Sequence, residues 1–135
     1  MGKLDEGKVY WLDSKNIYKA VESLPEQIEK TWERVNEEIK DWKMRKVDKV
    51  VIAGMGGSAL GGRVVAALSG KYVKLPILIV NEFNLPGYVD KKTLVVLVSY
   101  SGNTEEVLSM AEDARAAEAE VVAIGEGGKL LEKAN

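Results

Sequence analysis

The sequence predicts an α/β protein: a three-layer α/β/α sandwich built on a parallel sheet and preceded by N-terminal helices. Two observations favour this fold. Short apolar runs alternate with helix-like segments from residue 47 onward, and each run is almost continuously apolar. Strands of that composition are typical of parallel sheets that are buried on both faces. The alternation of strand and helix implies right-handed crossovers, with helices packed against the sheet.

Residues 1–46 are expected to form an N-terminal helical segment that packs on the following domain. Five apolar residues recur at spacings of four and three, as on one face of a helix; they are Ile28, Trp32, Val35, Ile39 and Trp42. Pro25 suits the first turn of this helix, and a shorter helix around residues 17–23 would begin at Asp13 or Ser14. We interpret the tryptophans as packing residues rather than as a ligand-stacking site.

Residues 47–135 are expected to form the α/β domain. The expected strands are residues 49–53, 77–80, 94–98 and 121–124. The expected helices are residues 58–68, residues 104–117 and a last one from about residue 129. The last strand would be uncovered and the last helix short, so we interpret the chain as the first part of a longer protein.

The composition limits the chemistry that this chain can perform. The sequence has no histidine and no cysteine, which excludes disulfides, thiolate metal sites and histidine acid–base catalysis. The net charge of −2 argues against general nucleic-acid binding. No apolar run approaches the ~20 residues of a membrane span, and the polar N-terminus lacks a secretory leader. We therefore expect a cytoplasmic protein with no nucleic-acid, membrane, metal or cofactor partner.

Two turns rich in glycine and hydroxyl groups carry most of the functional information. The first turn follows the apolar run of residues 50–53 and reads Gly54-Met55-Gly56-Gly57-Ser58-Ala59. The second follows residues 94–98 and reads Ser99-Tyr100-Ser101-Gly102-Asn103-Thr104. Each precedes a predicted helix, so backbone N–H groups and the positive end of the helix dipole favour an anion at the turn. Two such turns from one sheet can hold the two ends of a small phosphorylated ligand.

The first turn allows more than one interpretation. Its pattern Gly54-x-Gly56-x-x-Ala59 matches the dinucleotide-binding fingerprint, with Glu82 near the place of the acid that this fingerprint requires. A tight strand-to-helix turn without any ligand is the structural alternative. No Gly-Lys-Ser/Thr follows, which excludes a P-loop nucleotide site.

The second turn separates these alternatives. Ser99, Ser101 and Thr104 can each offer a hydroxyl to one small anion, as a phosphate monoester requires. Asn103 or Thr104 would cap the following helix, and Asn103 with Glu106 has the spacing of a capping box. Capping does not explain Ser99 and Ser101, so the pattern favours a phosphate site. Neither turn contains Lys or Arg, so any cation must come from elsewhere.

At these residues the chain resembles the sugar isomerase (SIS) domain, a flavodoxin-like phosphosugar-binding module. The resemblance is strongest to the N-terminal half of the bifunctional phosphoglucose/phosphomannose isomerases. It implies that Ser99, Ser101 and Thr104 bind the phosphate, and that Gly57 and Ser58 line the sugar site. It also implies that the catalytic Glu, His, Lys and Arg of that family lie beyond this chain, so no catalytic residue and no metal ligand is assigned here.

The resemblance implies an aldose–ketose isomerase that interconverts glucose 6-phosphate or mannose 6-phosphate with fructose 6-phosphate through a cis-enediol, without a cofactor. This chain would supply the phosphate- and sugar-binding loops, would be inactive alone, and would form a homodimer or pair with a missing C-terminal half. Glu82 would be structural or peripheral rather than the general base. Two alternatives stay open: a stand-alone phosphosugar-binding or regulatory SIS module, and a dinucleotide-binding domain.

Overall fold

The computed structural model describes residues 13–134, which divide into two compact units at Lys43 and Met44. The two units are considered one at a time. The expected packing of the N-terminal segment on the domain stays a prediction.

The first unit contains two helices, α2 (Ile17–Glu22) and α3 (Leu24–Glu38). Helix α2 begins at Ile17 with Asn16 as its N-cap, later than the expected start at Asp13 or Ser14, but the Asp13 carboxylate accepts hydrogen bonds of 2.7 Å from the amides of Ile17 and Tyr18. Pro25 lies in the first turn of α3, as the sequence predicts.

The expectation that Trp42 continues the apolar face of α3 is wrong, because this helix ends at Glu38. The chain leaves α-helical geometry through tight turns, in which the amide of Lys40 bonds to Glu37 and that of Trp42 bonds to Ile39. Glu37, Glu38 and Asp41 place negative charge at the C-terminal end of the helix, where the helix dipole disfavours it.

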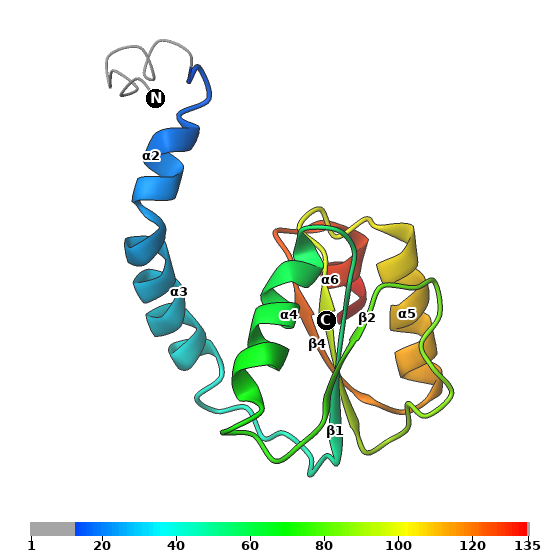
Figure 1. Cartoon of the computed structure of the whole chain (residues 1–135). Coiled ribbons are helices and arrows are strands. Elements are labelled where there is room, and N and C mark those ends of the chain that lie inside the picture. Colours follow the sequence, from blue (N-terminus) through cyan, green and yellow to red (C-terminus); the bar gives the residue numbers. More distant parts are fainter. Residues whose placement is uncertain (1–12, 135) are drawn as a thin grey trace. The chain divides into compact units, whose positions relative to one another are not determined.

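The second unit is built on four parallel strands in the order β2-β1-β3-β4. These strands are β1 (Lys49–Gly54), β2 (Ile77–Val80), β3 (Thr93–Val98) and β4 (Glu120–Ile124). The prediction of a parallel sheet with residues 49–53 in its interior and 94–98 beside them is confirmed (Figure 1). Each strand lies within one residue of its expected bounds at either end.

Helices cover both faces of this sheet. They are α4 (Ser58–Ser69), α5 (Glu105–Ala116) and α6 (Gly128–Ala134). Helix α4 contacts β1 and β2, whereas α5 contacts β3, β1 and β4, and α6 contacts β4 and α5. The crossovers from β1 to β2 and from β3 to β4 run in opposite directions along the sheet, so right-handed connections put α4 and α5 on opposite faces (Figure 1). The predicted three-layer sandwich is confirmed.

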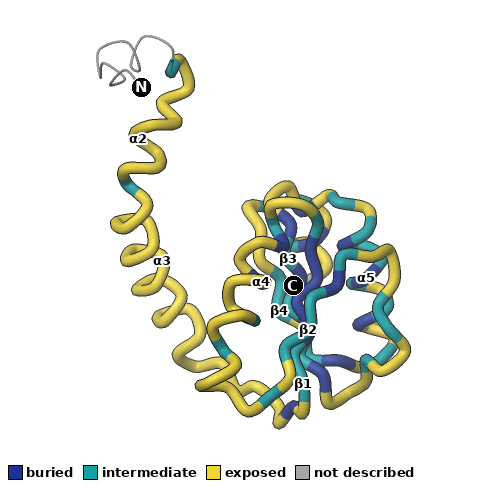
Figure 2. The backbone as a smooth tube through the Cα atoms, viewed as in Figure 1, coloured by how far each residue is buried: buried dark blue, intermediate teal, exposed yellow. Residues whose placement is uncertain are grey.

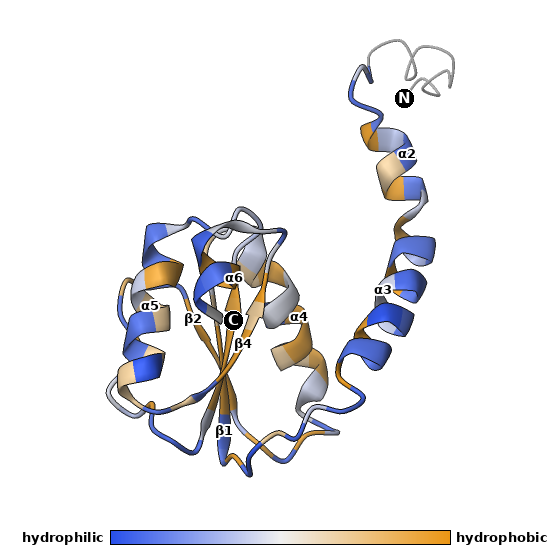
Figure 3. Ribbon diagram, turned by 180° about the vertical axis from the view of Figure 1, so that it is seen from behind, coloured by the Kyte–Doolittle hydropathy of each residue, from blue (hydrophilic) through white to orange (hydrophobic). Residues whose placement is uncertain are grey.

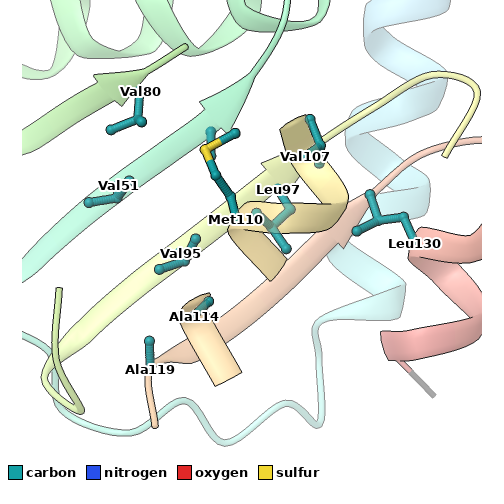
Figure 4. Packing of buried hydrophobic residues seen from close by; sticks show 10 residues of the cluster. Val51, Val80, Val95, Leu97, Val107, Met110, Ala114, Ala119 and Leu130 are labelled. Carbon is teal, nitrogen blue, oxygen red and sulfur yellow. The ribbon is translucent and has the colours of Figure 1, made fainter. Parts of the chain in front are cut away.

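The main hydrophobic core lies between the sheet and α5. Val51 and Val95 on neighbouring strands are fully buried, and Val107, Met110 and Ala114 of α5 are buried against them (Figure 4). Figure 2 shows the buried residues concentrated along the strands. Because β1 is covered on both faces and β3 is buried on its α5 face, the middle of both strands is apolar, and polar groups lie in the loops at their ends.

The connection from β2 to β3, residues 81–92, crosses β1 without a helix. Its Leu85 amide donates to the Asp113 carboxylate of α5 at 2.9 Å, and the Leu85 and Val89 side chains pack against the core. This irregular segment therefore covers the sheet on the α5 side, where a helix would otherwise lie.

Helix α4 is apolar on its outward face as well as on its inward face. Leu60, Val64 and Leu68 recur along one stripe and are exposed, and Figure 3 shows the apolar colouring along this helix.

Within residues 13–134, no helix combines the length and hydrophobicity that a membrane crossing requires.

Asp90 joins the amino ends of the two interior strands. Its carboxylate accepts bonds of 3.0 Å from Lys49 Nζ at the start of β1, from Thr93 Oγ1 at the start of β3, and from the Lys92 amide. The bonds from Lys49 and Thr93 lower the pKa of Asp90 below its ordinary value.

We expect Asp90→Asn to lower the midpoint of thermal unfolding at neutral pH. Because the pKa of Asp90 is depressed in the folded state, its stabilisation is complete above the unfolded value of about 3.9 and is lost as the pH falls through the folded value. Circular dichroism melts of both proteins from pH 7 to pH 2 should therefore converge at acid pH. Asp48→Asn, which removes only an exposed 3.4 Å ion pair with Lys92, is the control and should change little. A difference for Asp90→Asn that persists unchanged at pH 2 would contradict the prediction.

Candidate functional site

The two predicted turns leave neighbouring strands at the same edge of the sheet. Gly54 at the end of β1 is in register with Val98 at the end of β3. A side chain on Gly54 would bring its Cβ within 2.9 Å of the Val98 carbonyl oxygen, so the strands converge closely at this point. The prediction that both turns open at the carboxyl edge is confirmed.

The first turn is a tight entry into α4. Gly56 has a φ of 52°, a left-handed conformation that favours glycine. The amides of Ser58, Ala59 and Leu60 bond to the carbonyls three residues earlier, at 3.1, 3.3 and 3.0 Å. Gly57 is the exposed N-cap and Ser58 the first helical residue, half-buried. Since the first helical amides are already engaged, the free donors of this turn are the amides before Ser58 and the Ser58 hydroxyl.

A side-chain network that the sequence analysis missed holds the first turn. The Asn81 carboxamide, directly after β2, donates to the carbonyl oxygen of Gly54 and accepts a 2.7 Å bond from Arg63 Nη2 of α4. The position of Asn81 at the carboxyl end of the predicted strand 77–80 was the one available signal. Glu82, the acid next to it, is exposed. Its expected structural or peripheral role stays a prediction.

The second turn brings two of its three predicted hydroxyl groups together. Ser99 is 2% exposed, and its Oγ lies 2.8 Å from Thr104 Oγ1. Ser101 is exposed, and its Oγ accepts a 3.2 Å bond from the Asn103 amide. Thr104 is the N-cap of α5 but makes no side-chain cap bond, because its hydroxyl is directed to Ser99. The amides of the first turn of α5 therefore stay available to an anion.

The expected capping box of Asn103 and Glu106 does not form. The Asn103 carboxamide instead donates to the Ser101 carbonyl at 3.0 Å and accepts from the Lys129 amide at 3.2 Å. Asn103 thus ties the second turn to the start of α6, a contact between distant parts of the sequence that local spacing does not reveal.

A third turn, residues 125–128 after β4, lies directly against the second one. Gly102 has a φ of 64°, and a Cβ at this position would overlap the carbonyl oxygen of Gly127. The Tyr100 phenol bonds to the Glu126 carboxylate, which raises the pKa of Tyr100 above its ordinary value. The sequence analysis assigned no role to this turn.

The charged groups near the turns do not form a cation site. Among residues 13–134 no three carboxylates gather where they could hold a metal ion. Lys129 is the cationic residue whose backbone bonds to the second turn, and its side chain is exposed. The turns thus offer neutral donors, namely N–H and hydroxyl groups, which suit a phosphate rather than a metal.

A cleft of about 680 Å³ lies elsewhere, along the exposed strand β4 between α5 and α6. Its floor is apolar, and its rim carries both signs of charge, with Lys133 paired to Glu112 and Arg45 paired to Glu120. It contains none of the predicted binding residues. We assign it to the open edge of the sheet rather than to the two turns.

The chain is similar to several bifunctional phosphoglucose/phosphomannose isomerases. It is 46% identical over 116 residues to that of Caldicellulosiruptor bescii, a match covering 86% of this chain and 34% of the relative. It is 36% identical over 119 residues to that of Aquifex aeolicus, covering 87% of this chain and 35% of the relative. The chain therefore spans about a third of the curated relatives it matches. No family model matches the chain.

Solved structures share the fold. A presumed phosphosugar isomerase from Salmonella typhimurium superimposes with a TM-score of 0.58 at 27% identity, over 73% of this chain and 31% of the other. The tagatose-6-phosphate ketose/aldose isomerase of Escherichia coli also has a TM-score of 0.58, over 80% of this chain and 32% of the other. At 21% identity, this second likeness concerns the fold alone.

We expect Asn81→Ala to destabilise the second unit by about 1–3 kcal/mol, because the Gly54 carbonyl then loses its partner in a half-buried position. Urea denaturation followed by circular dichroism measures the loss. Asn84→Ala is the matched control, since Asn84 is exposed in the same connection and makes only a 3.4 Å bond to Asp113. Equal losses in the two variants would rule out a specific role for Asn81.

Proposed function

Since this chain belongs to the SIS-domain phosphosugar isomerases and is related to the bifunctional phosphoglucose/phosphomannose isomerases, we propose that it binds a hexose 6-phosphate at the two turns. The proposal assigns the phosphate to Ser101 and Thr104 directly and to Ser99 through its bond to Thr104, and the sugar to Gly57 and Ser58. The observation that carries it is the convergence of two donor-rich turns at one sheet edge, on neighbouring strands.

The second turn is the better match to a phosphate. Ser101 and the Thr104 hydroxyl stand at the N-terminus of α5 with the unbonded amides of its first turn, and these groups are the direct donors in our proposal. The nearly buried Ser99 holds the Thr104 hydroxyl in place. Hydrogen bonds to a charged acceptor contribute about 1.5–3 kcal/mol each, so a few donors supply useful affinity without a cation.

For the whole protein we propose an aldose–ketose isomerase that moves a proton between C1 and C2 of glucose 6-phosphate or mannose 6-phosphate and fructose 6-phosphate, through a cis-enediol. This chain contains no histidine. Its share of the reaction is to bind and orient the substrate, while proton transfer falls to parts of the longer relatives that it does not span. Pairing with such a part or with a second copy, and a cytoplasmic location, belong to the same proposal.

The end of β2 weighs against a dinucleotide-binding domain. A dinucleotide site requires an acid there for the ribose hydroxyls. Asn81 occupies the position beside the first turn and is bonded to Gly54 and Arg63, while Glu82 is exposed. A stand-alone binding module has the same ligand and differs only in lacking turnover.

We expect the double variant Ser101→Ala/Thr104→Ala to weaken hexose 6-phosphate binding by about 100-fold or more, because each lost bond to the phosphate contributes roughly 1.5–3 kcal/mol. Isothermal titration calorimetry with glucose 6-phosphate and fructose 6-phosphate measures the change. Ser109→Ala, a half-buried hydroxyl further along α5, is the control and should bind normally. Unchanged affinity in the double variant, or tighter binding of NAD than of sugar phosphate, would refute the proposed site.

We expect residues 1–135 alone to isomerise hexose 6-phosphates negligibly. The chain has no histidine and neither turn contains Lys or Arg, so the preorganised charges that usually dominate such catalysis are missing. A coupled assay, with a full-length bifunctional isomerase as the positive control, measures the turnover. A rate near the ~10 s⁻¹ of ordinary enzymes would show that the chemistry resides in this chain.

A further inference from the structure

The third turn and the start of α6 are bonded to almost the whole of the second turn. The Ser99 amide donates to the Ile124 carbonyl at 3.0 Å, and the Glu126 amide donates to the Tyr100 carbonyl at 3.1 Å. The Leu130 amide donates to the Gly102 carbonyl at 3.0 Å. With the 3.2 Å bond from the Lys129 amide to Asn103, four hydrogen bonds join the second turn to this part of the chain, three from the third turn and α6 and one at Ile124, the last residue of β4. The second turn is therefore shaped by residues that follow it by more than twenty positions.

One close approach in this contact falls on the residue that orients Thr104. A Cβ built on Gly125 would lie 2.5 Å from the carbonyl oxygen of Ser99. An ordinary contact between such atoms is about 3.5 Å, so a side chain at Gly125 would displace the Ser99 backbone by roughly 1 Å. The hydroxyl of the same Ser99 lies 2.8 Å from that of Thr104, so a shift of Ser99 is transmitted to the proposed phosphate donors.

Gly127 in the same turn provides a contrast. A Cβ built on Gly127 meets no atom within 4 Å, so alanine fits there without displacing its surroundings. Both glycines lie beside the second turn, but only a side chain at Gly125 would collide with it, although the two are two residues apart in one segment.

We infer that the segment of residues 125–130 is a positioning element for the phosphate-binding turn, and that Gly125 acts through Ser99 to set the placement of the Thr104 hydroxyl. This inference rests on the proposed function. Under this inference, the affinity for hexose 6-phosphate depends on the third turn, which touches neither phosphate nor sugar in the proposed site.

The test compares Gly125→Ala with Gly127→Ala in the 135-residue chain. Calorimetry with fructose 6-phosphate should show binding weakened by about tenfold or more in Gly125→Ala, the loss expected when one hydrogen bond to a charged acceptor is misplaced, and near-normal binding in Gly127→Ala. Amide resonances of residues 99–104 in ¹H–¹⁵N spectra should move in Gly125→Ala only. Normal affinity in a folded Gly125→Ala protein overturns the inference, as does an equal loss in both variants.

If Gly125→Ala fails to fold, a milder pair of variants at Lys129 tests the same inference. Lys129→Pro removes the amide that bonds to Asn103, at a first-turn position of α6 where proline is tolerated. Lys129→Ala removes the same positive charge and keeps the amide. Weaker binding in Lys129→Pro than in Lys129→Ala supports the inference, and equal binding overturns it.

The failure of the proposed function gives a different result from the failure of this inference. If the unmodified chain binds no sugar phosphate, the proposed function fails. The resonances of residues 99–104 then still decide whether Gly125 positions the turn: a selective shift in Gly125→Ala supports it, and unchanged resonances overturn it.

Discussion

The burial of β1 on both faces is the constraint from which the rest of this structure follows. Val51 and Ala53 lie under α5, while Ile52 lies against Gly62 of α4. A strand enclosed in this way is apolar along its length, and its neighbour β3, buried at alternate residues, is apolar in its middle as well. Polar groups can gather only where the strands end, so the chemistry of the domain is restricted to the edge where β1 and β3 finish side by side.

The anion site proposed at that edge relies on backbone N–H and hydroxyl groups, and the segments around the edge hold these groups in position. Asn81 fixes the first turn through the Gly54 carbonyl, and residues 125–130 fix the second turn through three hydrogen bonds, beside a fourth at the end of β4. Neutral donors attract a phosphate strongly only when they already point at it. A site without a cation therefore depends more on such supports than one that holds its ligand by charge.

The sequence was sufficient to predict the four strands, their parallel arrangement and the position of both turns, because apolar runs and glycine-hydroxyl turns are local patterns. It was not sufficient for the end of α3, where the apolar spacing continues to Trp42 but the acidic residues near Glu38 disfavour further helix. Asn81 and Gly125 were missed for another reason. Each acts on a turn more than twenty residues away, and only the folded sheet brings them together.

The strand order also has a kinetic consequence. The pairing of β1 with β3 joins Lys49 to Thr93, whereas the other pairings join residues much closer in sequence, such as Val50 with Ile77 and Leu94 with Glu120. Long-range pairings of this kind slow folding. In a chain that has formed only the β1–β2 and β3–β4 pairs, the first turn lies on one half-sheet and the second turn on the other. The two turns come together only when β1 pairs with β3. The appearance of ligand binding during refolding would therefore report the docking of two half-sheets, an event separate from the formation of any helix.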